Sequence, residues 1–182
     1  MKRLALSLVA ALSMAVIATT AFAADTVTQA VTAGTRTASN ANLTLPSVAY
    51  SHIAQTSTGS MTLTTDDSTG SGAGWNVTIL SSAFVYTGAN GGTNIPAVNF
   101  SLSSAAAPVM TAGQAVDVTG GPKVPAISPV GTLDAAKKTV QANAGFGLGT
   151  YTQALGVSLS IPAQSRAGTY TGTLTTTIAA AP

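Results

Sequence analysis

Hydrophobic and polar residues alternate most regularly in residues 70–88, a stretch that also carries the only tryptophan. Trp75, Val77 and Ile79 fall on one side of an extended chain, with polar residues between them. A period of two with β-branched and aromatic residues is typical of a strand with one buried face. Because an indole supplies a large apolar area, we predict that the core forms around Trp75. Stacking of Trp75 on a sugar ring is the less favoured interpretation.

The same alternation predicts strands before and after this stretch. Residues 25–37 predict a first strand, at an edge, with Val27, Gln29 and Val31 on one side. Residues 40–53 follow, interrupted by a proline, and residues 59–65 and 95–104 predict further strands. At the C-terminus, residues 155–161 and 169–178 predict two strands joined into a hairpin by a turn at 162–168. The inward positions are expected to be Leu43, Leu45, Val48, Tyr50, Met61, Leu63, Val98, Phe100, Leu102, Leu155, Val157, Leu159, Ile161, Tyr170, Leu174 and Ile178.

Glycine- and proline-rich loops separate these short strands, and no stretch has a convincing helical stripe. Residues 135–144 have the propensity for a short helix, but Val140 alone could anchor its apolar face. We therefore favour a strand or an irregular segment there. The sequence predicts an all-β fold, an antiparallel β-sandwich of roughly eight to ten strands.

The first residues have the features of an export signal. Lys2 and Arg3 precede an apolar stretch at residues 4–18, and Ala21-Phe22-Ala23 forms an A-x-A cleavage site. We predict a signal peptide at 1–23 and a single domain at 24–182, secreted and without an integral membrane span after cleavage. An uncleaved anchor is the alternative.

The balance of charged residues limits the kinds of partner that the chain is expected to bind. Without Lys2 and Arg3, the seven basic residues fall to five, which balance the five acidic ones. A neutral chain is not expected to bind nucleic acid or anionic membranes, since both need clustered cations. Only 7% of the residues are charged, and there is neither cysteine nor glutamate, a composition typical of an extracellular structural protein.

Two stretches carry a family resemblance, residues 65–88 (TDDSTGSGAGWNVTILSSAFVYTG) and residues 145–182. They resemble the WxL domain of bacterial surface proteins. The first motif falls on Trp75, Asn76 and Val77, with valine in place of leucine. The second would fall on the final strand and is degenerate, because its tryptophan is absent from Thr176, Thr177 and Ile178. The resemblance implies a secreted all-β domain that attaches non-covalently to peptidoglycan. The Gly-x-Tyr start of the last strand is weakly similar to fimbrial subunits.

Few residues suggest ligand chemistry. Asp66 and Asp67 could hold Ca²⁺, but calcium prefers six to eight oxygens, so capping of a turn is favoured. His52, the only histidine, cannot anchor a typical zinc site alone. Lys137 and Lys138 are expected to be a solvated pair, with contact to an acidic wall polymer as the alternative. We predict no catalytic, metal or cofactor site.

These features favour a non-enzymatic protein of the cell surface, bound to a cell-wall polymer, to matrix or to another surface protein. The alternative is a self-assembling filament subunit, a homopolymer in which residues 24–37, with Val27, Gln29 and Val31, complete the sheet of a neighbour. A secreted hydrolase is a distant third, because few general acids or bases remain.

Overall fold

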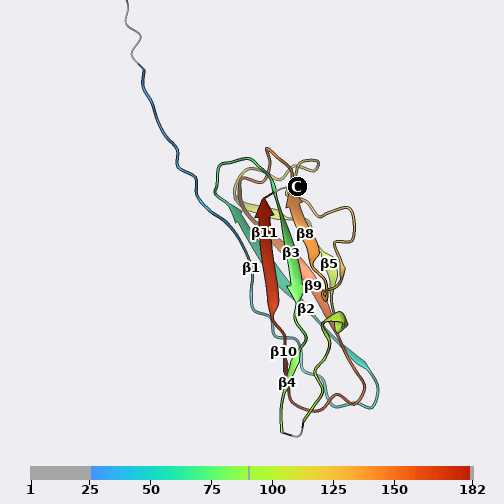
Figure 1. Cartoon of the computed structure of the whole chain (residues 1–182). Helices are drawn as coiled ribbons and strands as arrows, with labels where there is room; N and C mark the ends of the chain where they lie inside the picture. The colour runs from blue at the N-terminus through green and yellow to red at the C-terminus, as the bar shows by residue number, and fades with distance from the viewer. Residues whose placement is uncertain (1–25, 90, 181–182) are drawn as a thin grey trace, which may run out of the picture. The chain divides into compact units, whose positions relative to one another are not determined.

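The strand that begins at Trp75 lies in the middle of the smaller of two facing sheets (Figure 1). The computed structural model describes residues 26–89 and 91–180. Within this part of the chain, the smaller sheet has the order β11-β3-β8. Its strands are β3 (Trp75–Ser81), β8 (Lys137–Ala142) and β11 (Leu174–Ala180).

The larger sheet is built on two long strands that pair along their full length, β2 (Gln55–Asp67) and β9 (Gly149–Ile161). Its order is β1-β2-β9-β5-β7, and β6 also pairs with β9. The shorter strands are β1 (Arg36–Asn40), β5 (Phe100–Ala105), β6 (Val109–Gly113) and β7 (Gly131–Thr132). Every strand pair is antiparallel, which confirms the predicted all-β antiparallel fold.

The core fills the space between these two sheets. Trp75 is completely buried, and its ring lies 6.2 Å from that of Tyr151 on the facing strand β9. The alternation therefore predicted the inward faces of β2, β3 and β9 correctly. The buried hydrophobic residues are Met61, Leu63, Trp75, Val77, Ile79, Ile95, Phe100, Leu102, Leu133, Val140, Ala142, Tyr151, Leu155, Val157 and Leu159.

A short ribbon continues the smaller sheet at one end. Strand β4 (Val85–Thr87) follows β3, and strand β10 (Thr169–Thr171) precedes β11. The two pair with each other, and hydrogen bonds between Ser82 and Thr173 bridge the break between ribbon and sheet. A 3-10 turn, η1 (Ala97–Asn99), leads into β5. Residues 135–144 contain β8, which agrees with the strand favoured from the sequence.

Two predicted strands are wrong in position. The first strand begins at Arg36, and residues 26–35 have no regular secondary structure. The Gly34 amide donates to the Ser68 carbonyl directly beyond the last pair of β1 and β2, and the described residues before it, 26–33, form no backbone pairing. Residues 41–54 also contain no strand, because Pro46 lacks a backbone donor. Val48 and Tyr50 are correspondingly 41% and 55% exposed rather than inward.

The predicted C-terminal hairpin is also wrong. Strand β9 pairs with β2, β5 and β6, whereas β11 pairs with β3 in the opposite sheet. Residues 162–168 thus carry the chain from one sheet to the other. Val98 likewise departs from its predicted inward position, since it lies in η1 and is half exposed.

The chain divides into two units, Met1–Val31 and Thr32–Pro182, and the strands described above belong to the second. Of the first unit, the structure describes residues 26–31. The predicted signal peptide at 1–23 lies outside the described residues. Within 26–89 and 91–180, no helix has the length and apolar character needed to cross a membrane.

Candidate functional site

A groove opens at the end of the second unit where the β4/β10 ribbon extends beyond β3 and β11. Two walls and a floor form it, and Phe84 and Ile95 complete the lining. The irregular segment 43–51 makes one wall, and β10 with residues 165–168 makes the other. The floor comes from the facing sheet, where Ser57 of β2 and Leu159 and Ile161 of β9 reach the end of their strands.

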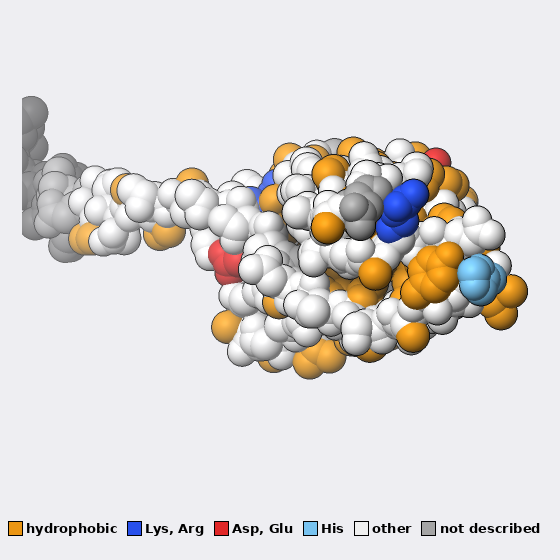
Figure 2. All heavy atoms as spheres, turned by 90° about the horizontal axis from the view of Figure 1, so that it is seen from below, with side chains coloured by type: hydrophobic (Ala, Val, Ile, Leu, Met, Phe, Trp, Pro, Cys, Tyr) orange, Lys and Arg blue, Asp and Glu red, His pale blue; other side chains and the backbone are white. Residues whose placement is uncertain are grey.

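The groove has a volume of about 660 Å³ and a partly apolar lining with little charge. Leucine and aromatic side chains alternate there with Ser and Thr hydroxyls. Among the lining residues that the structure describes, Arg166 carries the only charge. Figure 2 views this end and shows hydrophobic side chains gathered near a basic side chain and the histidine, with few other charged side chains in view. An open, mostly apolar concavity with a few polar groups is the usual form of a binding site.

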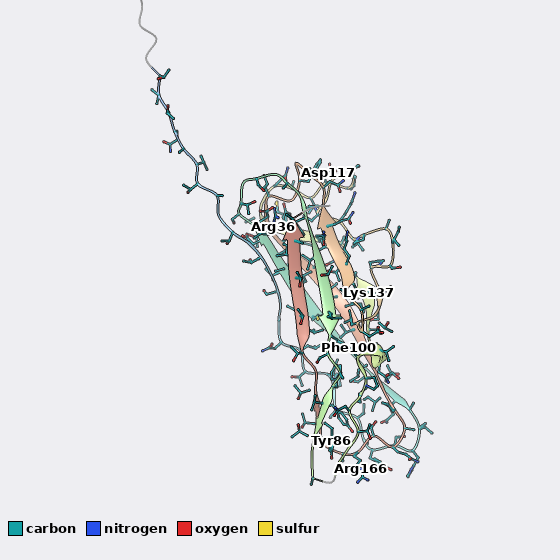
Figure 3. All side chains as sticks on the ribbon, viewed as in Figure 1. Arg36, Tyr86, Phe100, Asp117, Lys137 and Arg166 are labelled. Carbon is teal, nitrogen blue, oxygen red and sulfur yellow. The ribbon has the colours of Figure 1, made fainter. Side chains whose placement is uncertain are left out.

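Two tyrosines connect the ribbon wall to the loop beside it. Tyr86 and Tyr170 are cross-strand partners whose rings lie 5.2 Å apart. Each hydroxyl donates a hydrogen bond to the 162–168 loop, from Tyr86 to the Ala167 carbonyl and from Tyr170 to the Arg166 carbonyl, both at 2.9 Å. Figure 3 shows Tyr86 and Arg166 at this end of the second unit, far from Arg36.

The opposite wall is held mainly by side chains. The Ser57 hydroxyl donates to the Pro46 carbonyl at 2.9 Å, and Leu45 packs over Gly59 of β2. At the rim, the rings of Tyr50 and His52 meet edge to face at 5.2 Å. Both residues are exposed, so they present an aromatic pair to any ligand that enters the groove.

The residues of the WxL-like motif lie in the sandwich rather than at this groove. Trp75 is buried and donates its indole N–H to the Gly147 carbonyl at 2.9 Å, which confirms the core role favoured from the alternation. Asn76 is half-buried and Val77 is buried. A tryptophan with no exposed surface cannot itself contact a wall polymer.

The degenerate second motif lies on β11, paired with the first motif on β3. Ile178 is the register partner of Val77 and packs against the core, while Thr177 faces solvent. The Thr176 hydroxyl accepts a hydrogen bond of 2.7 Å from the amide of Asn40 on β1. Thr176 therefore connects the edge strands of the two sheets.

Asp66 and Asp67 cap the turn after β2, as the sequence favoured. Asp67 pairs with Arg36 at 2.8 Å and accepts hydrogen bonds from the backbone and hydroxyl of Thr69. Burial raises the pKa of Asp67, but these hydrogen bonds outweigh it and hold the pKa below its ordinary value of 3.8. Asp66 accepts from the hydroxyls of Ser68 and Thr150, both at 2.6 Å. Within 26–89 and 91–180, no group of three or more metal-ligating side chains occurs.

The remaining predicted residues lie elsewhere. Val27 and Val31, in the first unit, are 99% and 93% exposed, and Gln29 between them is also exposed. Lys137 and Lys138 are half-buried on β8, away from the groove lining.

Comparisons with known protein families, with curated proteins and with solved structures find no match to this chain.

The groove was not predicted, because it combines segments that are distant in sequence. One signal was present: Pro46 next to otherwise alternating apolar residues indicates a chain that lies against a sheet without joining it.

Proposed function

We propose that this chain is a non-enzymatic structural protein of the extracellular surface that works by non-covalent association through the groove. The observation that carries this proposal is the groove itself, a concavity of about 660 Å³ whose described lining has one charged residue, Arg166. A site of this kind suits an uncharged polymer or an extended peptide, since its apolar side chains supply contact area and its hydroxyls supply hydrogen bonds.

Cell-wall polymer is one occupant that fits. Tyr50 is 55% exposed at the rim, and an exposed aromatic ring offers a flat apolar face for a sugar. The resemblance to WxL domains and the predicted export signal point to the same location. In this proposal the WxL-like residues support the scaffold, while the groove contacts the polymer.

Retention on purified cell walls tests this occupant. Tyr50→Ala is expected to lower the retained fraction several-fold, because it removes the exposed ring without disturbing the core. Ile127→Ala is the matched control, since Ile127 is 84% exposed and does not line the groove. Retention of the unmodified chain no greater than that of an unrelated β-sandwich would count against wall association.

A second copy of the chain is the other candidate occupant, and the exposed valines favour it. Val27 and Val31 lie in a described segment without secondary structure, in a chain with few charges to block edge-to-edge association. Electron microscopy of the concentrated protein tests self-assembly. Ordered fibres that disappear on deletion of residues 26–33 would support it, whereas dispersed particles at all concentrations would argue against it.

A further inference from the structure

We infer that the groove receives residues 26–31 (TVTQAV) of a second copy, as an added strand between β10 and segment 42–50. This inference rests on the proposed function, because it names the partner of the same groove. It is supported by unpaired backbone, by matching chemistry and by the reach of the chain.

The first observation concerns the backbone of the groove walls. Among the described residues, the nine successive residues 42–50 take part in no backbone–backbone hydrogen bond. Strand β10 on the opposite wall pairs with β4 along one edge only. Unpaired strand edges are the usual acceptors for an incoming strand, whose own N–H and C=O groups they satisfy.

The second observation concerns chemistry. The segment 26–31 contains no charge, proline or glycine, and its two valines are β-branched. Val27 and Val31 fall on the same face of an extended chain, and both are almost fully exposed. The groove offers Leu43, Leu45 and Ile161 as apolar partners, with only Arg166 charged among its described lining residues. The segment therefore matches the groove, because it brings uncharged, apolar side chains on a stretch of chain without regular secondary structure.

The third observation is reach, which points to a second copy rather than to the same one. The Gly34 amide donates to the Ser68 carbonyl, so the chain is held from Gly34 onward beside the end of β2. The groove lies at the other end of β2, where Ser57 is ten residues before Asp67 and therefore about 34 Å away. Val27 is seven residues from Gly34 and reaches about 25 Å at most. A segment that leaves one end and a groove at the other make a head-to-tail contact, which generates an open filament.

Complementation between two charged variants tests the inference. The double variant Val27→Asp/Val31→Asp places two charges on the segment and leaves the groove unchanged. Val48→Asp places a charge in the groove lining, where Val48 is 41% exposed, and leaves the segment unchanged. Val118→Asp is the matched control, because Val118 is 92% exposed and does not line the groove. Tryptophan fluorescence of each variant confirms that the core is folded.

Sedimentation velocity of the exported chain is expected to show oligomers that grow with concentration, and Val118→Asp should behave in the same way. Each of the other two variants is expected to be monomeric, with its association weakened at least about 100-fold by charge at buried apolar positions. Their equimolar mixture is expected to form a dimer, because one intact segment meets one intact groove.

Three results would overturn the inference, and they are distinguishable. If Val48→Asp assembles like the unmodified chain while the segment variant does not, another surface accepts the segment and self-assembly stands. If all variants are monomeric and Val48→Asp alone loses cell-wall retention, the groove holds the polymer and the proposed function stands. If the chain neither assembles nor binds walls, the inference and the proposed function both fail.

Discussion

Replacing Gly147 by alanine should destabilise the sandwich far more than the same change at Gly145. Both glycines lie in the loop between β8 and β9 with similar positive φ angles, 79° and 84°. Left-handed backbone costs any other residue about 1–2 kcal/mol, so this penalty is common to both variants. The two positions differ in burial and in what a new methyl group would meet.

At Gly147 the added Cβ would lie 2.5 Å from the Ala142 Cβ and 2.7 Å from the indole nitrogen of Trp75. At Gly145 it would meet nothing within 4 Å. Relief of such a clash costs about 1–3 kcal/mol, and displacement of the indole also loses its hydrogen bond to the Gly147 carbonyl, about 1 kcal/mol. We therefore expect Gly147→Ala to be less stable than Gly145→Ala by about 2–4 kcal/mol.

Urea unfolding followed by fluorescence measures this difference, and the single tryptophan makes the signal specific for the core. The corresponding difference in Tm is about 4–16 °C for a domain of this size. Gly147→Ala should also shift the emission of the folded state to longer wavelength. Equal stabilities of the two variants, with unchanged emission, would show that the indole does not pack against Gly147 and would refute the proposed centre of the core.

Three further predictions concern the acid response, the core and the ribbon. Asp67→Asn should lower stability at pH 7 by about 3 kcal/mol, since Arg36 loses its partner. Because the folded pKa of Asp67 lies below 3.8, its contribution is present above that pH and is lost on further acidification. Acid titration of the unmodified chain should therefore show a loss of stability that Asp67→Asn lacks; parallel curves would contradict it. Leu133→Ala should cost about 2–5 kcal/mol in urea unfolding, because the side chain is completely buried although it lies outside the long strands. Ile127→Ala, at an exposed position, should stay within about 0.5 kcal/mol, and similar losses at both positions would argue against a core that includes the loop. Tyr86→Phe should weaken cell-wall retention or assembly more than it lowers the free energy of unfolding, since it removes the hydrogen bond from the ribbon to the Ala167 carbonyl. Unchanged retention and assembly would show that this hydrogen bond does not support the groove.

The sequence alone predicted which residues are inward on the regular strands, because alternation is a local property. Met61, Leu63, Leu155 and Val157 follow this rule without exception. Alternation carries no information about pairing partners, since strands of both sheets alternate equally. This is why the C-terminal strands were assigned to one hairpin, although residues 162–168 cross between the sheets.

The groove depended on features that no local pattern contains. Residues 41–54 have apolar side chains at strand-like positions, but Pro46 keeps them out of the ladder and leaves Tyr50 at the surface. Leu133 was missed for a related reason, because it follows the two-residue strand β7 and has no alternating neighbours. Backbone hydrogen bonds with Phe100 and Ser81 hold it where its side chain enters the core. Such positions are fixed by tertiary contacts rather than by periodicity.

Cross-linking between an introduced pair of cysteines is the most direct test of association through the groove. The chain contains no cysteine, so a variant with Val31→Cys and Val48→Cys can form disulfides only through these two positions. Mild oxidation of the concentrated protein should produce a ladder of covalent oligomers on a non-reducing gel. Mass spectrometry should then identify peptides in which position 31 of one copy is linked to position 48 of another. Assembled fibres in which each position is linked only to the same position of another copy, or in which no links form, would contradict the head-to-tail account.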